Sequence, residues 1–172
     1  IHPAGLFEAV THPEIFDKQI GRNYQFRAIN QSGEQTTMHD PYSFDPYISD
    51  YDLHLLGEGR HWDCYRKLGA HLREVNGVEG VNFAVWAPNA ESVSVVGDFN
   101  KWDRRTHAMR KHGPGGIWEI FIPDLKLGTL YKFSVKQRGG HVIDKIDPYG
   151  FAAEVPPLTA NIVSDLDRHQ WN

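Results

Sequence analysis

The sequence predicts an all-β protein. We expect an immunoglobulin-like β-sandwich over residues 71–172, preceded by a short helical linker over 49–70 and a partial second β-sandwich over 1–48. Three observations lead to this expectation. Apolar and polar residues alternate over short segments, turn residues separate these segments at roughly 8–12-residue spacing, and one segment of the first part recurs in the last.

The recurring segment defines the first 48 residues. Tyr24–Phe44 and Tyr131–Phe151 align without a gap, and GLFEAV from Gly5 echoes GIWEIF from Gly116. The Tyr-x-Phe alternation predicts a strand, the glycine loop predicts a hairpin, and Asp-Pro-Tyr ends it because proline has no N–H for the ladder. The identical pairs are Tyr24/Tyr131, Phe26/Phe133, Gly33/Gly140, Asp40/Asp147, Pro41/Pro148, Tyr42/Tyr149 and Phe44/Phe151.

The first copy has no counterpart of the two strands that precede Gly116. Residues 1–48 are therefore expected to be the C-terminal half of a truncated sandwich, and the chain to be a piece of a longer protein. Half a sandwich exposes its inner face and an unpaired edge, so this part should be frayed unless something covers it.

The linker is predicted to hold two short helical pieces. Asp50 and Asp52 can cap the first, and residues 61–68 place Trp62, Tyr65 and Leu68 on one side of the second at i, i+3, i+6 spacing. From about His71 onward the alternation predicts strands. The expected core residues are Val81, Phe83, Val85, Val93, Val95, Phe121, Tyr131, Phe133 and Val135.

Composition excludes several classes of function. A formal charge of −4 and a pI near 6.2 argue against nucleic acid as a partner, since nucleic-acid modules usually present a basic face. No run reaches the ~18 apolar residues of a membrane span. The single cysteine, Cys64, excludes an internal disulfide and favours a reducing compartment, so we expect a cytoplasmic protein.

No catalytic or cofactor constellation is evident. The ten histidines show no HxH or HExxH spacing, so solvated surface histidines are expected and no metal. Asp144 and Asp147 could serve as a carboxylate pair, but Asp147 precedes Pro148 and recurs as Asp40, which favours a turn-forming role. We therefore predict neither a catalytic residue nor a cofactor.

One stretch carries a specific resemblance. GVEGVNFAVWAPNAESVSVVGDFNKWD, with LYKFSV and DPYGF after it, resembles the glycogen-binding type of carbohydrate-binding module (family 48) that precedes the catalytic barrel in amylase-superfamily enzymes. The linker DYDLHLLGEGRHWDCYRKLGAH and the preceding repeat are similar to those of bacterial glycogen branching enzymes. The resemblance implies α-glucan partners (glycogen, maltooligosaccharides) and a (β/α)₈ barrel, a fold of ~250 residues that carries the catalytic carboxylates.

The resemblance also implies three binding residues. Trp102 occupies the position of a sugar platform, where a glucose ring can lie on the apolar indole face. Lys132 and Asn161 match polar contacts to sugar hydroxyls, and His141 stands where some binders carry a second platform tryptophan. With one platform, we expect weak binding, with a Kd on the order of 0.1–1 mM.

A second interpretation stays open at this stage. Trp102 could pack on a neighbouring domain instead of a sugar, Lys132 could be an ordinary solvated lysine, and the chain could be a purely structural interdomain module that binds no glucan. Trp86 and Trp118 are expected in the core or at an interface. Loss of co-sedimentation with glycogen would separate the two interpretations.

Overall fold

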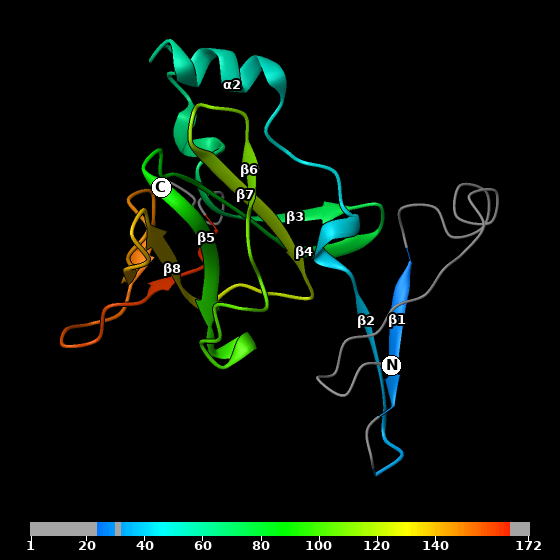
Figure 1. The fold of residues 1–172 in the computed structure, drawn as a ribbon. Coiled ribbons are helices and arrows are strands. Elements are labelled where there is room, and N and C mark those ends of the chain that lie inside the picture. The colour runs from blue at the N-terminus through cyan, green and yellow to red at the C-terminus, as the bar shows by residue number, and fades with distance from the viewer. Residues whose placement is uncertain (1–23, 30–31, 166–172) are drawn as a thin grey trace, which may run out of the picture.

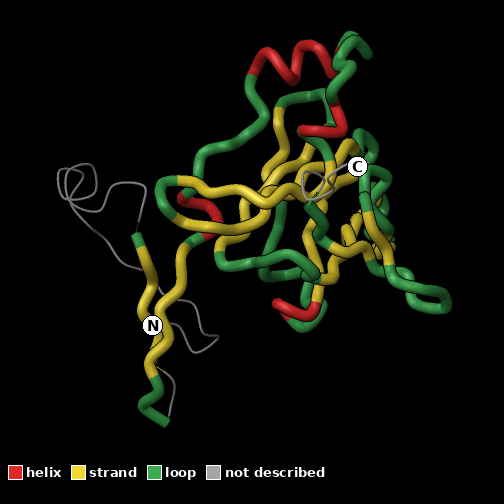
Figure 2. The backbone as a smooth tube through the Cα atoms, turned by 180° about the vertical axis from the view of Figure 1, so that it is seen from behind, coloured by secondary structure: helices red, strands yellow, loops and turns green. Residues whose placement is uncertain are grey.

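The computed structural model describes residues 24–29 and 32–165. Its main body is a β-sandwich with the helix α2 at one end, and a long two-stranded hairpin projects away from it (Figure 1). Seen from behind, the hairpin again stands apart from the sandwich (Figure 2). The segment GLFEAV from Gly5, which is similar to GIWEIF from Gly116, lies outside the described residues. None of the described helices is long and apolar enough to cross a membrane.

The strands predicted from alternation are all present, and three more accompany them. β3, β6 and β10 have weaker patterns because they are short or lie at sheet edges. In chain order the elements are β1 (Gln25–Ile29), β2 (Gln35–His39), η2 (Pro41–Ser43), α2 (Asp50–Gly57), η3 (Cys64–Arg66), β3 (Gly69–Val75), β4 (Val78–Trp86), β5 (Ala90–Gly97), η4 (Asp98–Asn100), β6 (Arg110–His112), β7 (Ile117–Pro123), β8 (Leu130–Gln137), β9 (Val142–Lys145), β10 (Ala152–Ala153) and β11 (Asn161–Ile162).

Two antiparallel sheets form the sandwich. One has the strand order β3-β4-β7-β6, and the other has the order β10-β11-β8-β5, with β9 also paired to β8. The inner faces of both sheets supply one apolar cluster. It includes eight of the nine predicted core residues, of which Val135 is only partly buried and lies at the margin. The ring centroids of Phe83 and Tyr131 lie 5.0 Å apart across it.

Phe121 is the exception among the predicted core residues. It is buried, but it points away from the sandwich interior and packs on Phe44, with ring centroids 4.7 Å apart. The reason is that every residue of β7 is buried, because the linker and the chain before it cover the outer face of this sheet. Alternation of apolar and polar residues identifies a strand with one buried face. It cannot tell which side chains point to which face when both faces are buried.

The linker forms a second, smaller apolar layer on that outer face. Ile48, Leu68, Ala84 and Ile117 are buried together there, and side chains of α2 pack against them. Ser49 begins α2 as its N-cap, with Asp52 completing a capping box. The predicted second helix is only the single turn η3. Its predicted common face was wrong, because Trp62 is 91% exposed while Leu68 is buried.

The hairpin β1–β2 repeats the hairpin β8–β9 in register. Phe26 pairs with Met38 as Phe133 pairs with Lys145, at the positions that the sequence repeat aligns. Their surroundings differ, since Phe26 is 52% exposed while Phe133 is 1% exposed. The second hairpin is covered by β5 and by the opposite sheet. Among the described residues, no element covers the first hairpin in this way.

The same pair of hydrogen bonds to an aspartate closes both copies of the repeat, and we call it the Tyr–Asp clip. The hydroxyl of Tyr131 donates to Oδ2 of Asp147 at 2.6 Å, and Oδ1 of Asp147 accepts the N–H of Tyr149 at 2.8 Å. In the first copy Tyr24 donates to Asp40, whose Oδ1 accepts the N–H of Tyr42 at 2.9 Å. The turn-forming role predicted for Asp147 is thus confirmed.

We expect Tyr131→Phe to lower the free energy of unfolding by about 1–3 kcal/mol, because it leaves Oδ2 of the buried Asp147 without its donor. Burial raises the pKa of Asp147, and the bond from Tyr131 is the main opposing influence. Tyr24→Phe is the matched control: its clip is only partly buried and should cost less. Urea unfolding of both variants checks this, and equal losses would contradict it.

Candidate functional site

The turn after β5 displays Trp102. Oδ1 of Asn100 accepts the N–H of Gly97 at 3.0 Å, and its Nδ2 donates to the carbonyl of Val95 at 2.9 Å. The N–H of Trp102 donates to the carbonyl of Gly97 at 2.9 Å, closing the turn. A side chain at Gly97 would collide with the Leu130 carbonyl, so this position needs glycine.

The turn holds two residues in the left-handed region. Lys101 has φ 55° and Trp102 has φ 59°, an unusual conformation for a bulky aromatic residue. Such backbone costs about 1–3 kcal/mol per residue and persists only where its surroundings fix it, most often at functional positions. The indole Nε1 donates to Oδ1 of Asp98 at 2.8 Å, which occupies the only polar group of the ring. The side chain stays 39% exposed, so its apolar surface remains available.

Antiparallel pairing places Lys132 next to this indole. Val96, near the end of β5, pairs with Lys132 near the start of β8. Tyr131 and Phe133 point into the core, and Lys132 points outward between them, as the alternation predicted. Its Nζ lies 6.0 Å from the centroid of the Trp102 ring and donates to Oγ1 of Thr159 at 2.7 Å.

Asn161 does not join these two residues on the surface. It is 4% exposed, its Oδ1 accepts the N–H of Asp147 at 2.6 Å, and its amide lies directly over Gly150, where any side chain would collide. The direct sugar contact that the resemblance implied for Asn161 is therefore replaced by an internal role. β11 needs this amide to hold the Asp-Pro-Tyr turn against β8, and the same segment carries Thr159.

The surface around Trp102 combines an apolar ring face, the Lys132 ammonium and the Thr159 hydroxyl. A shallow hollow of about 390 Å³ borders the ring and is lined by residues 102–105, three of which are charged. Thr159 and Asp98 were missed by sequence reasoning. Only their positions in the sequence could have indicated them. Thr159 lies two residues before Asn161, and Asp98 begins the turn that carries Trp102.

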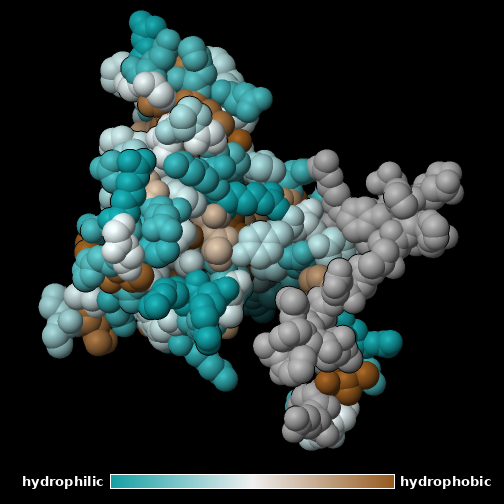
Figure 3. Space-filling model, in the orientation of Figure 1, coloured by the Kyte–Doolittle hydropathy of each residue, from teal (hydrophilic) through white to brown (hydrophobic). Residues whose placement is uncertain are grey.

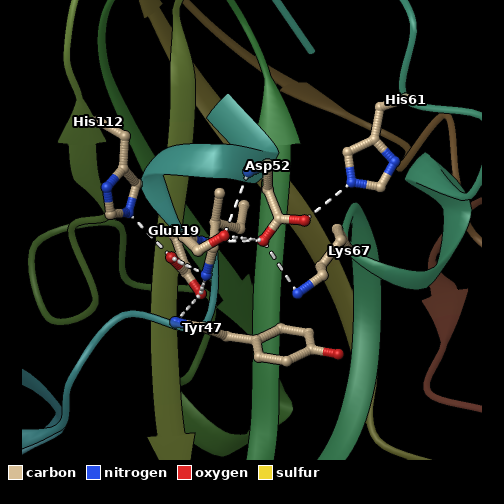
Figure 4. Close-up of polar contacts among 8 residues, drawn as sticks. Tyr47, Asp52, His61, Lys67, His112 and Glu119 are labelled. Atoms are coloured by element: carbon tan, nitrogen blue, oxygen red, sulfur yellow. Dashed lines mark hydrogen bonds and ion pairs between the residues drawn. The ribbon is translucent and has the colours of Figure 1, made fainter. Parts of the chain in front are cut away.

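A second polar cluster lies on the outer face of the other sheet, where it binds the linker (Figure 4). The carboxylate of Glu119 accepts the N–H groups of Tyr47 at 2.8 Å and Ile48 at 3.3 Å, and lies 2.9 Å from Nε2 of His112. We call these contacts, together with those of Asp52 described next, the linker clamp.

Asp52 forms the other half of the linker clamp. Its Oδ1 lies 2.9 Å from Nε2 of His61 and its Oδ2 lies 3.0 Å from Nζ of Lys67. The ammonium of Lys67 also sits 3.8 Å from the ring centroid of Tyr47, which links the two halves.

The two histidine–carboxylate pairs correct one expectation. His61 and His112 were predicted to be solvated surface residues, but both are largely buried beside these carboxylates. Each pair combines a histidine and a carboxylate, as catalytic acid–base pairs do. In both carboxylates, however, each oxygen already accepts a hydrogen bond or ion pair from within the chain. Among the described residues, no group of three or more His, Cys, Asp or Glu side chains could hold a metal ion.

Comparison with known proteins identifies a family match for part of the chain. Residues 67–150 match the family described as Carbohydrate-binding module 48 (Isoamylase N-terminal domain). The segment of residues 67–150 is therefore similar to this family. The matched region contains the turn after β5 and Lys132.

The chain is also homologous over its length to glucan branching enzymes. It is 51% identical to 1,4-alpha-glucan branching enzyme GlgB of Synechocystis sp. (97% of this chain, 22% of the relative). It is 49% identical to the enzyme of the same name from Rhodopirellula baltica (100% of this chain, 23% of the relative). The chain thus spans less than a quarter of the length of these relatives.

A solved structure shares the fold. The pullulanase from Anoxybacillus sp. LM18-11, determined in complex with maltotetraose, matches with a TM-score of 0.51 and 24% identity, covering 64% of this chain and 16% of the pullulanase. At this identity the likeness supports the sandwich fold alone.

We expect the linker clamp to weaken in acid. Burial raises the pKa of Glu119, but hydrogen bonds from His112 and Tyr47 outweigh this effect. Burial also raises the pKa of Asp52, and hydrogen bonds from Ser49, His61 and Lys67 outweigh it there. Both pKa values therefore lie below their usual ranges. The folded chain then binds fewer protons than the unfolded chain. This stabilisation is complete above about pH 5 and is lost as the pH falls through the lowered values.

Glu119→Gln tests this directly. The substitution should lower the free energy of unfolding at pH 7 by about 2–4 kcal/mol, since it removes the charge that faces His112 and two backbone N–H groups. Urea unfolding between pH 3 and pH 7 measures both effects. The variant should show a flatter acid dependence than the parent chain, and an unchanged dependence would contradict the role of Glu119.

A different variant tests how Trp102 is held. Asp98→Ala removes the acceptor of the indole N–H, whereas Asp98→Asn keeps an oxygen there. We expect only the alanine variant to shift the Trp102 indole resonance and broaden it, with stability changed by less than about 0.5 kcal/mol in either because the contact is exposed. Equal spectra for the two variants would exclude Asp98 as a positioning residue.

Proposed function

We propose that this chain binds α-1,4-glucan through Trp102 and Lys132 and holds it for the catalytic part of a glycogen branching enzyme. Glycogen and maltooligosaccharides are the ligand class. The single observation that supports this most strongly is the turn that fixes Trp102 with an exposed apolar face in a chain of a carbohydrate-binding family.

Each residue has a separate role in the proposed site. The apolar C–H face of a glucose ring stacks on the Trp102 indole, and the Lys132 ammonium and Thr159 hydroxyl contact sugar hydroxyls beside it. Asn161 acts as a positioning residue, because it fixes the start of β11, two residues after Thr159. His141 is exposed on the β8–β9 turn and offers a smaller ring than a second tryptophan, so affinity for a short glucan is weak.

The whole protein is proposed to cleave an α-1,4-glucan chain and rejoin it as an α-1,6 branch, in the cytoplasm, on a (β/α)₈ barrel that this sandwich supports. The homology to branching enzymes supports this proposal. Residues 1–48 are proposed to be the C-terminal half of a further sandwich, for which the matching hairpin register is the support. Residues 49–70 link it to the module of residues 71–172.

The alternative function is a purely structural module in which Trp102 packs on another domain. An exposed tryptophan serves either purpose, and only a ligand titration separates them.

A titration of the ¹⁵N-labelled 172-residue chain with maltoheptaose tests the proposal. We expect the indole N–H of Trp102 to shift saturably, with a Kd on the order of 0.1–1 mM. Trp102→Ala should abolish the binding at this site while the remaining spectrum keeps its dispersion, and Lys132→Ala should weaken it by about threefold to tenfold.

Trp62→Ala is the matched control for these variants. Trp62 is 91% exposed and stands on the linker, away from Trp102, so its loss should leave the titration unchanged. If Trp102 stays silent at several millimolar maltoheptaose, the sugar site is absent and the structural alternative holds.

A further inference from the structure

A groove of about 750 Å³ lies between α2, η3 and the turn that joins β6 to β7. This volume falls within the ~300–1,000 Å³ typical of ligand sites. Apolar surface is visible directly beneath α2 (Figure 3). The apolar side chains that line the groove include Leu53, Leu56, Leu68, Trp86 and Ile117.

Trp86 is the most exposed of these side chains. It is 60% exposed, more than Trp102, although it ends the well-paired strand β4. Its Nε1 donates to the carbonyl of Gly115 at 3.0 Å, so the ring is fixed to the β6–β7 turn by its only polar group. Trp102 is fixed to its own turn in the same way, by Asp98. Both indoles thus present an apolar face with the N–H already satisfied.

The charges around the groove select the kind of ligand. None of the residues that line it is a lysine or arginine, so it offers no cation to a phosphate or carboxylate. Each of its three histidines lies beside a carboxylate. His61 and His112 pair with those of the linker clamp, and Nε2 of the exposed His54 lies 3.5 Å from Oε1 of Glu58. Asp50, His54 and Tyr149 add polar groups to the apolar lining. A neutral ligand with apolar faces and hydroxyl groups fits this lining.

We propose that this groove is a second α-glucan site, with Trp86 as its platform and Asp50 and His54 as hydroxyl partners. It extends the proposed function and rests on the same ligand class. β5 begins four residues after Trp86 and ends five residues before Trp102, so the two platforms lie at opposite ends of the sandwich. Figure 1 shows this separation as the distance between α2 and the turn after β5.

Two sites on one module have a consequence for long glucans. A branched glucan that reaches both platforms binds with an avidity that exceeds either site alone, whereas a short oligosaccharide occupies each site independently. We therefore expect binding to glycogen to fall in either single variant, Trp86→Ala or Trp102→Ala, and to fall further in the double variant.

Cys64 provides a direct readout of the groove. It is the only cysteine of the chain and lines the groove, with its Sγ 3.4 Å from the Tyr149 hydroxyl. In Trp102→Ala, which removes the first site, maltoheptaose should slow the reaction of Cys64 with Ellman's reagent and shift the Trp86 indole resonance. Trp86→Ala should abolish this protection, with a loss of about tenfold or more in affinity at the groove.

Controls separate the groove from the first site and from a folding defect. Trp86→Phe keeps a ring but not the bond to Gly115, and should retain partial protection. Trp62→Ala should retain full protection. If maltoheptaose shifts Trp102 but never protects Cys64, the groove proposal falls and the proposed function stands.

Two further outcomes also overturn the groove proposal. If Cys64 becomes protected as protein concentration rises, without sugar, the groove is an interface between copies of this chain. If sugar protects Cys64 equally in Trp86→Ala, Trp86 is not the platform. Protection of Cys64 with a silent Trp102 would support the groove while removing the first site.

Discussion

The fold depends on a single buried carboxylate in the middle of a strand. Glu119 lies on the outer face of β7 and accepts the backbone N–H groups of Tyr47 and Ile48, directly before the linker, which an apolar residue could not do. A carboxylate this deeply buried is costly unless its oxygens are satisfied. His112 and these two N–H groups satisfy them, so the chain must enter the linker at this one place on the sheet. Asp52 repeats the arrangement a few residues later with His61 and Lys67.

This attachment explains how one sandwich can carry two different surfaces. With the linker covering the outer face of the β3-β4-β7-β6 sheet, β7 is buried on both sides. The other sheet keeps a bare edge region, where the turn after β5 displays Trp102 beside Lys132. α2 is held over the end of the first sheet, which creates the groove at Trp86. The linker is therefore part of the architecture of the module.

The two proposed platforms, Trp86 and Trp102, are held in the same physical way. Each tryptophan follows or ends a strand of the sandwich, and each has its indole N–H occupied by a turn. The ring is then presented with its orientation already fixed, so binding does not have to order it. At Trp102 this is achieved with strained backbone at two residues, which Asn100 and the carbonyl of Gly97 hold in place. The repeated Tyr–Asp clip gives the same kind of rigidity to the hairpins.

The sequence by itself determined what depends on local pattern. Alternation identified the strands and eight of the nine core residues, the repeat located both hairpins with their Asp-Pro-Tyr turns, and the GDFNKW stretch indicated Trp102. Tertiary structure decided which face each residue uses. Asn161 turned inward, because in the other sheet its amide oxygen accepts the N–H of Asp147. Phe121 turned outward, and His61 and His112 became partners of buried carboxylates, for a different reason, because the linker folds back over one sheet. That contact joins residues about seventy positions apart, and strand periodicity carries no information about what covers the second face of a sheet.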